Sequence, residues 1–179
     1  MGQENSNAKL SQNIIVFGVN LLLDEKLMGS EWQKDQINSC QDFTLYKNSS
    51  EKPNQLLWCP KYSQVLQQTV ESIILNIEFE GVLYVFEHTQ DQFQLNEHRK
   101  LIKWLMSEDS MRQCSLVLLC VSKSNDLAIN IKSQMEIELD LESMDSKQAR
   151  NLIIKQKEKE INLQFKKIIT QLIKMKNDS

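Results

Sequence analysis

Glycine and proline are scarce in this chain. Its 179 residues include four glycines and two prolines, so few positions can adopt the left-handed conformations or the close backbone approaches that glycine permits. Glycine-rich loops that cradle phosphate groups are hard to build from so few, because such a loop uses several glycines within a short stretch. The glycines are spread along the sequence, at Gly2, Gly18, Gly29 and Gly81.

Metal-ligating side chains are also few. The chain has four cysteines, with no C-x-x-C spacing, and its only histidines are His88 and His98. This set argues against a zinc site, and we expect no metal and no cofactor. Cys114 and Cys120 lie in or beside an apolar run, so we interpret them as small core residues in a reducing compartment. His98 lies on the apolar stripe of a helical pattern, where a packed histidine is expected rather than a ligand.

Long hydrophobic runs are missing as well. No apolar stretch approaches the roughly 18–20 residues needed to cross a bilayer, and residues 1–13 lack the features of a signal or transit peptide. We therefore expect a chain on the cytoplasmic side of membranes. A net charge of -3 gives no reason to expect nucleic acid as a partner. Residues 155–176 carry seven lysines against two glutamates; we interpret them as the solvated face of a helix, with an acidic partner or anionic lipid as the alternative.

Short apolar runs alternate with longer helical patterns, which favours a three-layer α/β fold with a mostly parallel sheet. Six strands are predicted, over residues 13–19, 42–47, 54–59, 81–87, 115–122 and 151–155. Apolar spacings of three and four predict about five helices, within 22–35, 62–79, 95–105, 130–141 and 161–172. The alternating pattern of 42–47 is typical of an edge strand, paired antiparallel with 54–59. The length fits a single domain, 13–179, after a flexible segment of residues 1–12.

The run Asn13-Ile-Ile-Val-Phe-Gly18-Val-Asn-Leu-Leu-Leu23-Asp24-Glu25-Lys26 indicates a strand that turns into a helix where a phosphate-binding loop would lie. Such a loop has the pattern G-x-x-x-x-G-K-[ST]: the second glycine admits the phosphates, the lysine neutralises them and the hydroxyl holds magnesium. Counted from Gly18, those three positions are Leu23, Asp24 and Glu25. Two acidic groups thus replace one lysine beside a triphosphate of about four negative charges, so the local field repels nucleotide.

Five stretches occur in an order that matches one family of nucleotide-binding proteins. Glu80-Gly81-Val-Leu-Tyr-Val-Phe86 is similar to Q-G-L-I-F-V-V-D, Leu101-Ile-Lys-Trp-Leu-Met-Ser-Glu-Asp109 to L-Q-K-M-L-N-E-D, and Leu116-Val-Leu-Leu-Cys-Val-Ser-Lys123-Ser-Asn-Asp126-Leu127 to L-L-V-F-A-N-K-Q-D-L. Leu57-Trp58 aligns with the tryptophan of W-D-x-G-G-Q, and Met1-Gly2-Gln-Glu-Asn-Ser6 fits the N-myristoylation pattern. In these stretches the chain resembles the Ras-like small GTPases, and within them the ADP-ribosylation-factor (Arf/Arl) family. The resemblance covers nearly the whole chain and implies a Ras-like fold.

The functional residues of that family mostly do not carry over. The W-D-x-G-G-Q run is replaced by Trp58-Cys-Pro-Lys-Tyr-Ser63, which leaves the magnesium, γ-phosphate and water-positioning roles vacant. No threonine occurs between Gly18 and Phe43 to serve as the switch threonine. The guanine-reading N-K-x-D lacks its asparagine, and its aspartate is displaced by one residue. The degenerate remnants of a nucleotide site are Gly18, Lys26, Lys123 and Asp126, and Gly2 is a lipidation candidate.

The resemblance and the lost motifs together suggest a non-catalytic, Arf-like pseudo-GTPase that serves as a structural or interaction subunit of a larger protein complex. It would be no enzyme and would not need GTP. Its partners would be other protein subunits, with weak membrane contact through Gly2. The sequence does not choose among ciliary, cytoskeletal, membrane-associated and organellar assemblies, mitochondrial ones included. The alternative is an atypical nucleotide-binding switch on membranes, in which Lys26, two residues late, replaces the loop lysine.

Overall fold

The computed structural model of this chain describes residues 13–18, 32–37, 43–48, 55–59, 68, 71, 79–107, 114–122, 128–143, 150–155 and 167–172. For residues 55–59, 128–129 and 150–155 it describes the backbone alone. The central element is a seven-stranded sheet with the order β2-β3-β4-β1-β5-β6-β7. Its strands are β1 (Asn13–Gly18), β2 (Trp32–Asp35), β3 (Thr44–Asn48), β4 (Gln55–Cys59), β5 (Gly81–Glu87), β6 (Ser115–Val121) and β7 (Arg150–Lys155).

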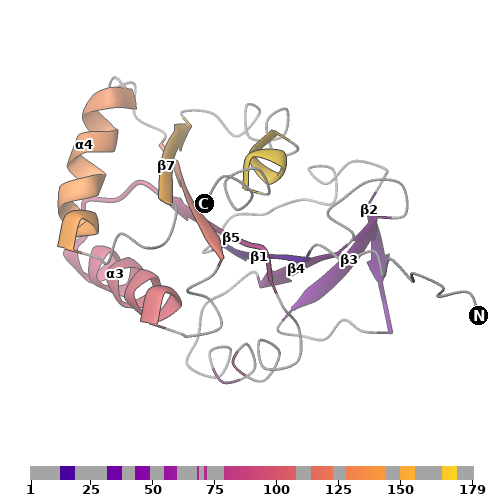
Figure 1. The fold of residues 1–179 in the computed structure, drawn as a ribbon. Helices are drawn as coiled ribbons and strands as arrows, with labels where there is room; N and C mark the ends of the chain where they lie inside the picture. Colours follow the sequence, from indigo (N-terminus) through magenta and orange to yellow (C-terminus); the bar gives the residue numbers. More distant parts are fainter. Residues whose placement is uncertain are drawn as a thin grey trace, which may run out of the picture.

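Most of the sheet is parallel. Strands β4, β5, β6 and β7 run in the direction of β1, whereas β3 is antiparallel to β4 and β2 is antiparallel to β3. Two helices, α3 (Gln92–Ser107) and α4 (Ala128–Glu138), follow β5 and β6 in the chain, and a short 3-10 helix, η1 (Leu141–Ser143), follows α4. Residues 167–172 are helical and lie on the other side of the sheet from α3 and α4 (Figure 1).

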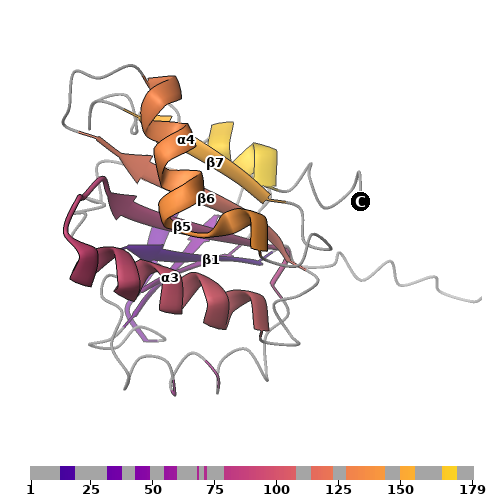
Figure 2. The ribbon, with the colours of Figure 1, turned by 90° about the vertical axis from the view of Figure 1, so that its left-hand side faces the viewer.

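Strands β1, β5 and β6 are continuous apolar runs because both of their faces are buried. Alternate residues of each strand belong to two separate apolar clusters. The α3 cluster includes Ile15, Phe17, Val82, Tyr84, Phe86, Leu116, Leu118 and Cys120, with Leu95, Leu101, Ile102 and Leu105 from α3 and Ile131 and Met135 from α4. The C-terminal cluster includes Ile14, Val16, Leu83, Val85, Val117, Leu119 and Val121, with Ile168, Ile169 and Leu172 from the last helix. Figure 2 shows α3 and α4 on the same face of the sheet.

The prediction of a six-stranded sheet with about five helices is wrong. Residues 32–35, predicted as the end of a helix, form β2, so the described sheet has seven strands and the predicted edge strand, now β3, lies one place inside the edge. Tertiary contacts decide this segment: Trp32 packs against the C-terminal cluster, and the Asp35 carboxylate pairs with Lys47 Nζ at 2.6 Å across the strands. The periodicity of the local sequence gives no information about these cross-strand contacts.

The helix predictions have mixed outcomes. The patterns at 95–105 and 130–141 are confirmed as α3 and α4, and residues 167–172 are the described part of the pattern at 161–172. For 62–79, Gln68 and Glu71 are described as helical and Phe79 as non-helical. The predicted flexible segment 1–12 lies outside the described residues. Among the helices that the structure describes, none is both long enough and apolar enough to cross a membrane.

Candidate functional site

The carboxyl ends of the parallel strands meet at one edge of the sheet. Gly18 ends β1 and lies opposite Val85 of β5, while Glu87 lies opposite Val121 of β6. Strand β1 pairs with β4 on one side and with β5 on the other. The strand order therefore reverses at β1, because β2, β3 and β4 lie on one side of it and β5, β6 and β7 on the other. In open α/β sheets, ligands bind outside the carboxyl ends of the strands where the strand order reverses. We therefore take this edge as the candidate functional site.

Residues that follow β5 and β6 hold the two strand ends together. The His88 N–H donates to the Val121 carbonyl at 2.8 Å, which extends the pairing one residue beyond β5. The next residue after β6, Ser122, is completely buried. His88 itself is half-buried, and its Nε2 atom is buried with no hydrogen-bond partner among the described residues. This edge therefore carries polar side chains that are packed into the fold rather than presented on loops.

The start of α3 at this edge is capped by its own chain. Asp91 precedes the helix, and its Oδ1 atom accepts a hydrogen bond from the Phe93 N–H at 2.8 Å. The Asp91 N–H in turn donates to Thr89 Oγ1 at 3.1 Å. Helix N-termini commonly bind phosphate through free N–H groups and the positive end of the helix dipole. Here a carboxylate of the chain occupies that position, as in an ordinary N-cap.

The described part of this edge is acidic at the end of β5 and in the segment that follows it. Within residues 85–91 and 119–122 the charged side chains are Glu87 and Asp91. Such a pair disfavours a phosphate and would favour a neutral or cationic group. In the described part of the chain, no group of three His, Cys, Asp or Glu side chains is placed to hold a metal ion.

Of the five residues predicted for nucleotide binding or lipidation, the structure places one. Gly18 is buried at the end of β1, where the sequence predicted the strand to turn. Lys26, Lys123, Asp126 and Gly2 lie outside the described residues.

The sequence pattern did not identify His88 and Glu87 as residues of this edge, and it gave Ser122 only as the replacement for the asparagine of N-K-x-D. The signal was present, because each stands at or directly after the end of a continuous apolar run, and parallel strands end together. Cys59 also reaches the edge, since its Cα lies opposite that of Phe17 in β1.

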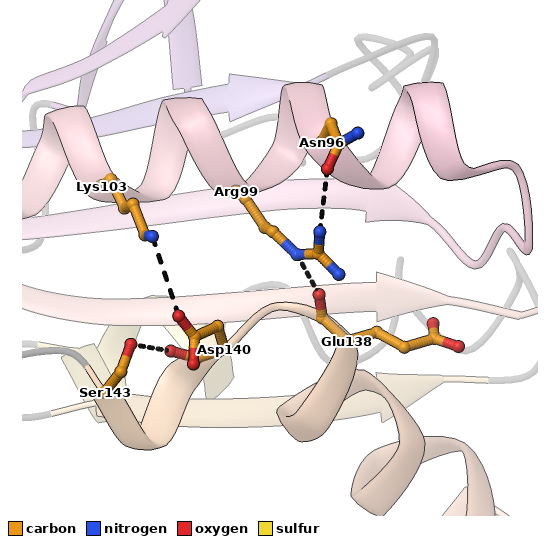
Figure 3. A network of polar contacts seen from close by, with 6 residues as sticks. All are labelled: Asn96, Arg99, Lys103, Glu138, Asp140 and Ser143. Carbon is orange, nitrogen blue, oxygen red and sulfur yellow. Dashed lines mark hydrogen bonds and ion pairs between the residues drawn. The ribbon is translucent and has the colours of Figure 1, made fainter.

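A second set of polar contacts joins α3 to the end of α4 (Figure 3). Arg99 Nε donates to the Glu138 carbonyl and Arg99 Nη1 donates to Asn96 Oδ1 at 2.8 Å. Lys103 Nζ lies 3.7 Å from Asp140 Oδ2. A guanidinium at the carbonyl end of a helix satisfies a free acceptor and interacts favourably with the helix dipole. These contacts connect α3 to the end of α4 and to the turn that follows it.

A third polar feature lies inside the α3 cluster. The Tyr84 hydroxyl and His98 Nδ1 are 2.5 Å apart, and burial lowers the pKa of His98 from its usual value, although the nearby Glu97 charge opposes the shift. The prediction of a packed histidine is confirmed, since His98 is 5% exposed. Cys114 and Cys120 are buried free thiols, as predicted; Cys114 Sγ donates to the Phe79 carbonyl at 2.9 Å.

In comparisons with known proteins, the chain matches no family model, and no curated protein sequence is significantly similar to it.

Proposed function

We propose that this chain is a non-catalytic, Arf-like pseudo-GTPase that acts as a structural or interaction subunit of a larger protein assembly. The observation that carries the proposal is the pair Asp24 and Glu25, which occupies the positions where a phosphate loop needs its lysine and its hydroxyl. Each lost hydrogen bond to a charged phosphate costs about 1.5–3 kcal/mol of binding free energy. Several are lost together in this sequence.

The described edge of the sheet supports the proposal from a second direction. Glu87 and Asp91 give the end of β5 and the segment that follows it a negative charge, and the Asp91 carboxylate fills the N-terminus of α3. The strands behind this edge are nonetheless fully packed, with Ile15, Leu83 and Leu118 at most 1% exposed. A fold that keeps its core and loses its ligand chemistry is expected when only its surfaces are used. The additional edge strand β2 departs from our expectation, so the proposal depends on motif residues and not on the strand count.

A nucleotide release assay tests the non-catalytic part of the proposal. The full chain is purified under native conditions with magnesium present throughout, then denatured, and the released guanine and adenine nucleotides are quantified per chain by chromatography. We expect far less than one nucleotide per folded chain, because Asp24 and Glu25 oppose the phosphates. A small GTPase with bound GDP, processed in parallel, controls for losses. Near-stoichiometric GTP or GDP would contradict the proposal and direct attention to Lys26 and Lys123.

The interaction part of the proposal predicts binding that does not depend on nucleotide. A protein that holds no γ-phosphate cannot switch by ordering loops around one, so its complex should be constitutive. The complex containing the chain is isolated from its native source and sized by gel filtration with GDP, with a non-hydrolysable GTP analogue, or with EDTA. We expect the same elution position and subunit composition in all three. Dissociation in one nucleotide state would support the atypical membrane switch instead.

A further inference from the structure

His98 is a buried ionisable group that the proposed function does not use. It projects from α3 into the apolar cluster beneath the helix, and its ring lies beside two aromatic rings of β5. The ring centroids are 5.9 Å apart for Tyr84 and His98 and 5.0 Å apart for Phe86 and His98. The Tyr84 side chain is completely buried, and its hydroxyl meets His98 Nδ1 at 2.5 Å. This is a polar contact between α3 and the sheet within an otherwise apolar cluster.

The surroundings offer little to balance a positive charge on His98. Strand β1 contains no ionisable side chain, and the ionisable side chain of β6 is Cys120, whose burial raises its pKa to about 12 and keeps it neutral. On β5 the ionisable groups are Tyr84 and, at the end of the strand, Glu87. On α4 and η1 they are Lys132, Glu136, Glu138 and Glu142.

On α3 itself the ionisable neighbours are Glu97, Arg99, Lys100 and Lys103. Glu97 is the one whose charge favours protonation of His98. Its carboxylate is already paired with Lys100 Nζ at 2.8 Å, which weakens its effect. The faces of the Tyr84 and Phe86 rings can attract a cation, but the loss of hydration on burying a charged imidazolium is the larger effect.

We propose that the Tyr84–His98 pair is a pH-sensitive fastener between β5 and α3, which stabilises the fold while His98 is neutral and weakens it when His98 takes up a proton. Neutral His98 can accept a hydrogen bond from the Tyr84 hydroxyl at Nδ1. After protonation both ring nitrogens are donors, so the hydrogen bond must reverse and a cation remains inside the cluster. Leu95, Ile102 and Leu105 of the same helix are buried in that cluster. Because they pack with His98 between α3 and the sheet, protonation of His98 lowers the free energy of unfolding of the whole fold.

The direction of the effect follows from proton linkage. Burial lowers the folded-state pKa of His98 below its ordinary value of 6.5, so below that pH the unfolded chain binds more protons than the folded one. The stabilisation is present in full above 6.5 and is lost as the pH falls from there through the folded-state pKa. Within this window a single proton lowers the ratio of folded to unfolded chains by at most about tenfold for each pH unit.

The experiment compares urea denaturation of the full chain between about pH 8 and about pH 5 for the wild type, His98→Asn and His88→Asn. These two residues are the only histidines in the chain, so each variant is the matched control of the other. His98→Asn keeps a polar atom near Tyr84 but cannot be protonated. We expect the wild type and His88→Asn to lose stability more steeply than His98→Asn as the pH falls from about 6.5 to about 5. Equal slopes for all three would overturn the proposal.

An NMR titration of the wild type keeps the proposal testable even if His98→Asn does not fold. The Cε1–H resonances of the two histidines are assigned with His88→Asn and followed over the same pH range. The His98 resonance should titrate well below the ordinary value of 6.5, or lose intensity as the protein unfolds before it titrates. Titration of His98 at or above that value in the folded protein would show that the cluster tolerates the charge, and the fastener would be rejected.

Discussion

Gly81 begins β5 at a place where the last helix comes unusually close to the sheet. A Cβ atom added to Gly81 would lie 2.9 Å from Leu172 Cδ2 and 3.5 Å from Leu172 Cβ and Cγ. Leu172 is itself completely buried in the C-terminal cluster, so its side chain has little space into which it could move. The glycine is therefore explained by packing, and not by an unusual backbone angle.

Replacing Gly81 with alanine should destabilise the protein. The added methyl group forces Leu172 out of its position, and overpacking of this kind costs about 1–3 kcal/mol, partly offset by the lower conformational freedom of alanine in the unfolded chain. The measurement is the free energy of unfolding by urea. In a Leu172→Ala background the same substitution should be neutral or stabilising, because the obstructing side chain is absent. An equal cost in both backgrounds would show that the two residues do not interact.

At the scale of elements, the turn that follows α4 contains a left-handed residue that is not glycine. Asp140 has φ 56°, and its N–H donates to the Ile137 carbonyl at 3.0 Å, while the Leu139 N–H donates to Met135 at 2.9 Å. Aspartate tolerates this conformation better than most residues. The Asp140 carbonyl then accepts a hydrogen bond from Ser143 Oγ at 2.9 Å. The residue thus joins α4 to η1 while Arg99 occupies the adjacent carbonyl at Glu138.

Asp140→Ala should lower the free energy of unfolding by about 1 kcal/mol, because alanine pays the left-handed penalty that aspartate partly avoids. Asp140→Asn should remain close to the wild type, since asparagine also tolerates that conformation and the ion pair it removes is weak. The Lys103–Asp140 contact is 3.7 Å long with side chains about half exposed, and such pairs contribute roughly 0–1 kcal/mol. Thermal or urea denaturation of both variants checks this. If Asp140→Asn were as damaging as Asp140→Ala, the charge and not the backbone angle would be the cause.

At the scale of the whole molecule, the continuous apolar strands were predictable from the sequence, and the edge strand β2 was not. Runs such as 81–87 and 115–121 leave no alternative to burial on both faces, and the structure places them in the middle of the sheet. Residues 32–35 are half exposed and contain Gln33 and Lys34, so their strand conformation depends on pairing with β3, about ten residues further along the chain. Local pattern cannot supply a contact of that kind.

The candidate site was predictable only in its position. The glycine at the end of the first strand pointed to the carboxyl ends of the parallel strands, which we take as the candidate site, and Gly18 lies there. The polar residues that line this edge come from segments distant in sequence, such as His88 and Ser122, whose backbones are joined only by the pairing of β5 with β6. Their proximity is a property of the sheet order, which the sequence pattern leaves open.

The two apolar faces of β5 raise the question of what aligns this strand with its neighbours during folding. A shift by one residue would turn every side chain to the opposite face, and because both faces are hydrophobic, the loss of burial alone would only weakly oppose it. Gly81 and Tyr84 would then change sides: Leu172 would meet a side chain where it now meets a glycine, and the Tyr84 hydroxyl would leave His98 Nδ1. Gly81 and the Tyr84 hydroxyl therefore select the observed alignment of β5. The other apolar residues of the strand would be buried in the observed alignment and in the shifted one alike.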